Sequence, residues 1–193
     1  MELLVTQIAI FASGAGSNAK KMIDYFRGSP RVHVRLIVTN NPNAGVVQIA
    51  REEEIPLLLV EKKQFQASGY VAELRNNGID FIVLAGFLWK IPLELIEAYE
   101  NKIVNIHPAL LPSYGGKGMY GSAVHAAVLA SKDRESGITI HFVDDKYDHG
   151  EIIFQAVCPI EEGETISTLA TKIHALEYQF YAPEVEKLLI NSQ

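Results

Sequence analysis

Asn105 and His107 stand two positions apart, directly before Pro108, at the end of an apolar run, Ile103–Ile106, that predicts a buried strand. Side chains alternate along a strand, so the amide and the imidazole point to the same side. Pro108 also favours an extended His107. An amide can hydrogen-bond a carbonyl oxygen that gains negative charge, and an imidazole can donate or shuttle a proton. The pair suits attack on a carbonyl carbon, and the segment alone fits a structural His–Pro turn equally well.

An acidic segment with Asp144, Asp145 and Asp148 follows a later predicted strand. A carboxylate from this segment beside His107 would favour the protonated imidazole and make it a better acid near neutral pH. Taken by themselves, Asp144 and Asp145 are typical of a solvated turn.

A loop of small residues, Ser13–Asn18, lies between a predicted strand and a predicted helix. Glycines allow the backbone to approach a ligand, and the free N–H groups at a helix start favour a phosphate. A dinucleotide would require an acidic residue at the end of the second strand, where Thr39–Asn41 has none. The loop therefore favours a simple phosphate, with a tight strand-to-helix turn as the alternative.

The elements that must position these residues alternate along the chain. Short apolar runs predict strands, and amphipathic stretches between them predict helices. This alternation predicts an α/β fold, a mostly parallel twisted sheet of about seven strands with helices on both faces and ligands at the carboxyl ends of the strands. The predicted strands are Gln7–Ala12, Val32–Thr39, Leu57–Val60, Phe81–Ala85, Ile103–Ile106, Ile138–Val143 and Ile152–Ile160, and the predicted helices are Ser17–Arg27, Gly45–Glu54, Gly69–Asn76, Pro92–Tyr99, Ser122–Ser131 and Thr168–Ile190, with a kink or break at Pro183.

Composition narrows the class of protein. The 193 residues predict one domain, 1–193, and the net charge of −6 argues against nucleic acid as a partner. Cys158 is the only cysteine, so an internal disulfide and a cysteine-based zinc cluster are excluded. The first residues lack a signal peptide, and no apolar stretch could span a membrane. We therefore expect a cytoplasmic protein that does not bind membranes.

Taken together, four motifs in order resemble the formyltransferase family that uses 10-formyltetrahydrofolate. They cover nearly the whole chain, which makes the set far more specific than any one motif. The motifs are Ser13–Asn18, Leu84–Phe87, Asn105–Pro108 with Leu110–Pro112, and Gly137–Val143 leading to Asp148.

The resemblance implies a Rossmann-like formyltransferase fold and direct transfer of the formyl group, without a covalent enzyme intermediate or a metal. It implies 10-formyltetrahydrofolate as the donor and the amine of glycinamide ribonucleotide as the acceptor, and we expect a monomer or a homodimer. The implied roles are catalysis for Asn105, His107 and Asp148, phosphate binding for Gly16, Ser17 and Asn18, contact with the glycinamide for Glu177, and folate binding for Leu88, Trp89, Lys90, Ile91, Phe142, Val143, Asp144 and Asp145.

Two alternatives stay open. A hydrolase that releases formate from the same folate would use a similar set of residues, although it usually carries an extra domain. A non-catalytic phosphate- or nucleotide-binding module would explain the loop Ser13–Asn18 but leaves the Asn, His and Asp residues without a shared purpose. Among the other histidines, we expect His33, His125 and His174 to be surface or packing residues, and His141 to lie near the site.

Overall fold

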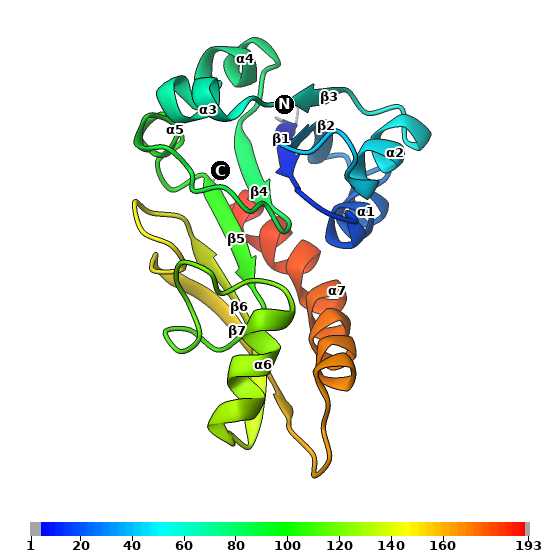
Figure 1. The fold of residues 1–193 in the computed structure, drawn as a ribbon. Coiled ribbons are helices and arrows are strands. Elements are labelled where there is room, and N and C mark those ends of the chain that lie inside the picture. The colour runs from blue at the N-terminus through cyan, green and yellow to red at the C-terminus, as the bar shows by residue number, and fades with distance from the viewer. Residues whose placement is uncertain (1–4, 192–193) are drawn as a thin grey trace.

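The protein is described by a computed structural model that covers residues 5–191 and contains a seven-stranded sheet (Figure 1). The strands are β1 (Thr6–Phe11), β2 (Val32–Thr39), β3 (Leu57–Leu59), β4 (Phe81–Leu84), β5 (Ile103–His107), β6 (Glu135–Phe142) and β7 (Ile152–Pro159). Their order in the sheet is β3-β2-β1-β4-β5-β6-β7. β1 to β5 pair in parallel, and β6 pairs antiparallel with both β5 and β7. The predicted fold class, a mostly parallel α/β sheet, is confirmed.

Helices cover both faces of the sheet, and each face has its own apolar core. Ile8 and Ile10 of β1 belong to the first core, whereas Ala9 and Phe11 belong to the second. All four are buried because β1 is a central strand with both faces covered, which explains its continuous apolar sequence. α1 (Ser17–Phe26), α2 (Gly45–Glu52), α6 (Ser122–Ser131) and α7 (Ile166–Asn191) contribute to the first core, and α3 (Lys62–Ser68), α4 (Val71–Asn76) and α5 (Leu93–Ala98) contribute to the second.

The helices differ from the prediction in two places. α3 was not predicted as a helix, because it is short and contributes one fully buried side chain, Phe65. α3 ends at Gly69, whose φ of 58° is left-handed, and α4 starts only after Tyr70. α7 runs without a break through Pro183, because the residues around it are held by packing. Tyr181 and Val185, on either side of the proline, are both buried in the first core.

The loops after β1 and β4 meet at the point where the order of the parallel strands reverses. The Ser13 N–H donates to the Gly86 carbonyl oxygen over 3.0 Å, and the Leu88 N–H donates to Ser13 Oγ over the same distance. Such a reversal opens a crevice at the carboxyl ends of the strands. Within residues 5–191, no helix is both long enough and apolar enough to cross a membrane.

Candidate active site

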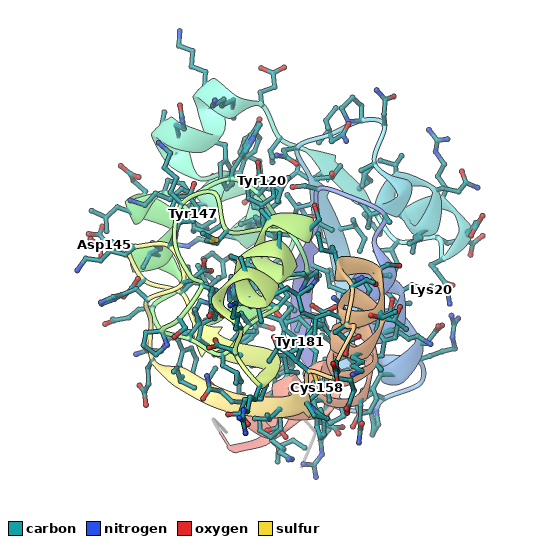
Figure 2. All side chains as sticks on the ribbon, turned by 60° about the horizontal axis from the view of Figure 1, so that its bottom comes forward. Lys20, Tyr120, Asp145, Tyr147, Cys158 and Tyr181 are labelled. Carbon is teal, nitrogen blue, oxygen red and sulfur yellow. The ribbon has the colours of Figure 1, made fainter. Side chains whose placement is uncertain are left out.

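A cavity of about 980 Å³ lies at this edge of the sheet. Its walls come from the loops after β1 and β4, the end of β5, the segment before α6, the acidic segment between β6 and β7, and α7. Figure 2 shows two aromatic residues of this lining, Tyr120 and Tyr147, with Asp145 farther out at the edge of the molecule. The lining residues are 14–18, 85–88, 105–108, 116–122, 125, 147, 148, 166, 167, 170, 174 and 177.

The three residues predicted to be catalytic meet in this cavity. Asp148 Oδ1 lies 3.6 Å from His107 Nδ1 and 3.5 Å from Asn105 Nδ2. Asn105 and His107 therefore project from β5 toward the same carboxylate, as the alternation of side chains predicts. His107 is buried. An amide donor, an imidazole and a carboxylate thus face one point, which is an arrangement suited to stabilising charge and moving a proton.

The orientation of the His107 ring is fixed by the backbone. Nε2 lies 2.8 Å from the carbonyl oxygen of Tyr114, which can only accept a hydrogen bond. Nε2 therefore carries a proton and donates it to this hydrogen bond, and Nδ1 is the ring nitrogen on the side of Asp148. The hydrogen bond to the backbone thus directs the second ring nitrogen toward the carboxylate of Asp148.

Asn105 is oriented by a neighbour that the sequence placed only near the site. His141 is the β6 residue paired with Asn105 in the antiparallel register. Its Nδ1 lies 2.7 Å from the carbonyl oxygen of Phe142, and its Nε2 lies 3.1 Å from Asn105 Nδ2. Burial lowers the pKa of His141, so the ring is neutral and its Nε2 can accept from the Asn105 amide. The amide nitrogen of Asn105 consequently faces the Asp148 side of the cavity.

Asp148 is held by its backbone conformation and by the segment before α6. Its φ is 51°, a left-handed conformation that is uncommon for residues other than glycine. Oδ2 accepts the N–H of Gly116 over 2.9 Å, which leaves Oδ1 directed at the histidine and asparagine. The His107 imidazole and the Asp148 carboxylate are therefore both tied to one short stretch of backbone, Tyr114 to Gly116.

The loop predicted to bind phosphate forms the other end of the cavity. Gly16 has a φ of 80°, and a Cβ there would lie 2.9 Å from side-chain atoms of Val46 and Ile49, so glycine is required. Gly16, Ser17 and Asn18 all line the cavity. Their backbone lies at the start of α1, where free N–H groups favour an anion.

Glu177 is buried against this loop, not exposed on its helix. Its Oε2 accepts the Asn18 amide over 2.9 Å and lies 2.9 Å from His174 Nδ1. The hydrogen bond with Glu177 raises the pKa of His174. The carboxylate thus connects α7 to the start of α1 and brings a histidine beside the predicted phosphate loop.

The residues predicted to bind folate are spread over several environments. Leu88 is half-exposed and lines the cavity. Trp89 packs against the rings of Phe65 and Phe87, and Ile91 is buried in the second core. Of the remaining five, Lys90 is exposed, Phe142 packs against the first core, Val143 packs against the second core, and Asp144 pairs with His149 over 2.7 Å. Asp145 is exposed at the tip of the acidic segment.

One hydroxyl behind the site holds the chain that leaves β5. Thr139 Oγ1 donates to the Ala109 carbonyl oxygen over 2.7 Å and accepts the Leu111 N–H over 2.9 Å. It also accepts from Gln155 Nε2 over 2.9 Å. Thr139 is fully buried, so these bonds fix the path between His107 and Tyr114.

Three functional candidates were missed by sequence reasoning. His125 and His174, predicted to be surface or packing residues, line the cavity, whereas His33 is exposed as predicted. The segment 116–122 also lines the cavity, although the sequence had given it no role. Its glycines at 116, 118 and 121 were the available signal. Among the described residues, no group of three or more His, Cys, Asp or Glu side chains has the geometry of a metal site.

Sequence comparison shows that the chain is similar to proteins named as formyltransferases. The model of the family described as formyl transferase matches residues 6–185. The chain is 34% identical to phosphoribosylglycinamide formyltransferase of Bacillus subtilis, covering 95% of this chain and 94% of that protein. It is 44% identical to the chloroplastic phosphoribosylglycinamide formyltransferase of Vigna unguiculata, but spans only 60% of that relative's length.

Solved structures with a similar fold carry the same kind of name. The crystal structure of phosphoribosylglycinamide formyltransferase from Bacillus halodurans superposes with a TM-score of 0.87 at 36% identity and covers 97% of both chains. Glycinamide ribonucleotide transformylase 1 from Geobacillus kaustophilus gives a TM-score of 0.86 at 35% identity, covering 96% of this chain and 99% of that chain. The chain belongs to the formyl transferase family.

Proposed function

We propose that the protein transfers the formyl group of 10-formyltetrahydrofolate to the amine of glycinamide ribonucleotide, a step of purine biosynthesis. The observation that carries the proposal is the meeting of Asn105, His107 and Asp148 in one cavity that also contains the loop Gly16–Asn18. The names of the relatives support the same reaction. A binding module would not require these three side chains to converge.

In the proposed reaction, the acceptor amine attacks the formyl carbon, and a tetrahedral intermediate with a negatively charged oxygen forms. The Asn105 amide and the protonated Nδ1 of His107 stabilise this oxygen, because both groups reach the same side of the cavity. Asp148 keeps the imidazole oriented and compensates its charge. When the intermediate collapses, the bond from the formyl carbon to the folate nitrogen breaks. That nitrogen gains a proton, and the acceptor nitrogen loses one.

The substrates are positioned by the two ends of the cavity. The backbone at Gly16 and Ser17, with the side chain of Asn18, binds the phosphate of the acceptor. Glu177 contacts the acceptor between the phosphate and the reacting amine. The folate lies on the side of Leu88, which is the predicted folate residue that lines the cavity. The other predicted folate contacts lie outside this lining and stay predictions: Trp89, Lys90, Ile91, Phe142, Val143, Asp144 and Asp145.

The test is to incubate the protein with 10-formyltetrahydrofolate, with and without glycinamide ribonucleotide, and to follow the deformylated folate. We expect product only when the acceptor is present. Formate release without the acceptor would indicate the hydrolase, and the absence of any turnover would exclude both enzymes.

The role of His107 is tested with His107→Ala, compared with His33→Ala, which changes an exposed histidine remote from the cavity. Loss of a general acid lowers the rate by about 100-fold to 10,000-fold, so we expect this loss in kcat for His107→Ala and an unchanged rate for the control. Near-normal turnover of His107→Ala would contradict the proposed mechanism. Circular dichroism of both variants checks that the fold is kept.

Three further properties stay predictions. We infer a cytoplasmic protein that is a monomer or a homodimer and that binds neither nucleic acid nor membranes. The single cysteine supports the compartment, and the negative net charge supports the absence of nucleic-acid binding. Light scattering of the purified protein gives the oligomeric state, and fluorescence microscopy of the tagged protein gives the compartment.

A further inference from the structure

The segment from Gly116 to Ser122 forms one wall of the cavity, and all seven of its residues belong to the lining. Gly116, Gly118 and Gly121 have positive φ angles of 98°, 91° and 55°. These conformations allow the backbone to fold back over the cavity, where a residue with a Cβ would be strained. Lys117 is placed between the first two of these glycines.

The start of this wall is attached to the catalytic residues. The Gly116 N–H donates to Asp148 Oδ2, and the preceding Tyr114 carbonyl oxygen accepts from His107 Nε2. A Cβ on Gly115 would lie 3.1 Å from the Cβ of Asp148, which shows how closely the two backbones approach. Lys117 therefore follows directly after the residue that is bonded to the catalytic carboxylate.

Lys117 is the only lysine or arginine among the described residues that line the cavity. The same lining contains two carboxylates, Asp148 and Glu177. Other lysines form ion pairs, such as Lys20 with Asp24 and Lys172 with Glu164. Within residues 5–191, the ammonium group of Lys117 makes no ion pair, and it is exposed. The cavity thus has one lysine cation that no carboxylate of the described chain neutralises.

We propose that Lys117 is a substrate-binding residue whose ammonium group binds an anionic oxygen group of a substrate in the cavity. This inference rests on the proposed function, in which both substrates carry such groups. The acceptor carries a phosphate, and the folate donor ends in glutamate carboxylates. Without Lys117, the described lining would present two carboxylates and no lysine or arginine to these anions.

The test compares Lys117→Met, which removes the charge at similar volume, with Lys117→Arg, which keeps it. Lys63→Met is the matched control, because Lys63 is an exposed lysine on α3 outside the cavity lining. KM and kcat are measured for the acceptor and for the donor separately, at low and high salt. Thermal unfolding of each variant checks the fold.

We expect Lys117→Met to raise the KM of one substrate by about fivefold to tenfold, with a smaller change in kcat, because a bond to a charged group contributes equally before and during the reaction. Lys117→Arg should restore most of the affinity, and Lys63→Met should not change it. The effect should shrink at high salt, because the ammonium group is exposed.

Two comparisons of substrates distinguish the phosphate of the acceptor from the glutamate carboxylates of the folate as the group that Lys117 binds. If Lys117 binds the phosphate, Lys117→Met raises the KM of the acceptor but not that of its dephosphorylated riboside. If Lys117 binds glutamate carboxylates, Lys117→Met raises the KM of the donor, more for a polyglutamylated folate than for the monoglutamate. An active wild-type protein with both KM values unchanged in Lys117→Met overturns this proposal alone. A wild-type protein without turnover overturns the proposed function and the role of Lys117 with it.

Discussion

The hydroxyl of Thr139 should be one of the largest single contributors to stability around the site. Thr139→Val keeps the shape of the side chain and removes the partner of the Ala109 carbonyl oxygen and of the Leu111 N–H. Gln155 Nε2 keeps its second bond, 2.9 Å to the Leu111 carbonyl oxygen. Ala109 and Leu111 are both buried, so the two orphaned backbone groups have no water to replace the lost partner.

Each buried polar group left without a partner costs about 1–3 kcal/mol, so Thr139→Val should lower the free energy of unfolding by about 3 kcal/mol. With a urea dependence of about 2.5 kcal/mol per molar for a chain of this size, the unfolding midpoint should fall by about 1 M. Thr139→Ser keeps the hydroxyl and loses one buried methyl group, so its cost should be about 1 kcal/mol.

Urea unfolding followed by circular dichroism measures both variants. Thr171→Val is the control, because Thr171 is exposed on α7 and its hydroxyl bonds only to the Ser167 carbonyl oxygen of the same helix. We expect a change within about 0.5 kcal/mol for the control. If Thr139→Val destabilises the protein no more than Thr139→Ser, the hydroxyl does not hold the chain after β5, and the reasoning is refuted.

Three further predictions concern other parts of the structure. Gly150→Ala should lower kcat at least about tenfold, because its Cβ would lie 1.9 Å from the Phe142 carbonyl oxygen and displace the acidic segment; steady-state turnover measures this. Burial lowers the pKa of His125 in the folded protein. Below the unfolded-state pKa of about 6.5, the unfolded chain binds a proton at His125 more readily than the folded protein does, so the free energy of unfolding should fall as the pH is lowered. Urea midpoints at about pH 7.5 and about pH 5.5 should therefore differ less for His125→Phe than for the wild type. Tyr181→Phe removes the buried hydrogen bond from the Tyr181 hydroxyl to the Leu84 carbonyl oxygen and should lower the unfolding free energy by about 1 kcal/mol in the same assay, whereas an unchanged value would show that this bond contributes nothing.

The sequence predicted the sheet and the central pair of the site because both depend on local patterns. Alternation along β5 was sufficient to place Asn105 and His107 on one side. Asp148 was assigned to the site from the resemblance, and its Oδ1 lies 3.6 Å from His107 Nδ1, while its catalytic role stays a prediction. The role of His141 could not be derived, since it depends on β6 pairing antiparallel with β5, and apolar periodicity does not give the direction of a strand.

The burial of Glu177 also could not be predicted from the sequence. A glutamate in an amphipathic helix is normally exposed, and only the packing of α7 against α1 places it beside Asn18. Pro183 is a second example. Proline alone predicts a helix break, but α7 continues through Pro183, and neighbours such as Tyr181 are buried in the core. Contacts between distant elements therefore decide what local propensity cannot.

The bond between Asn18 and Glu177 joins positions 159 residues apart in the sequence. During translation, Asn18 leaves the ribosome well before Glu177 is added to the chain. The residues of β1 and of the loop Gly16–Asn18 are therefore translated well before α7, which supplies the opposite wall of the cavity. The end of the cavity that contains Asn18 and Glu177 is thus completed only after α7 has been synthesised.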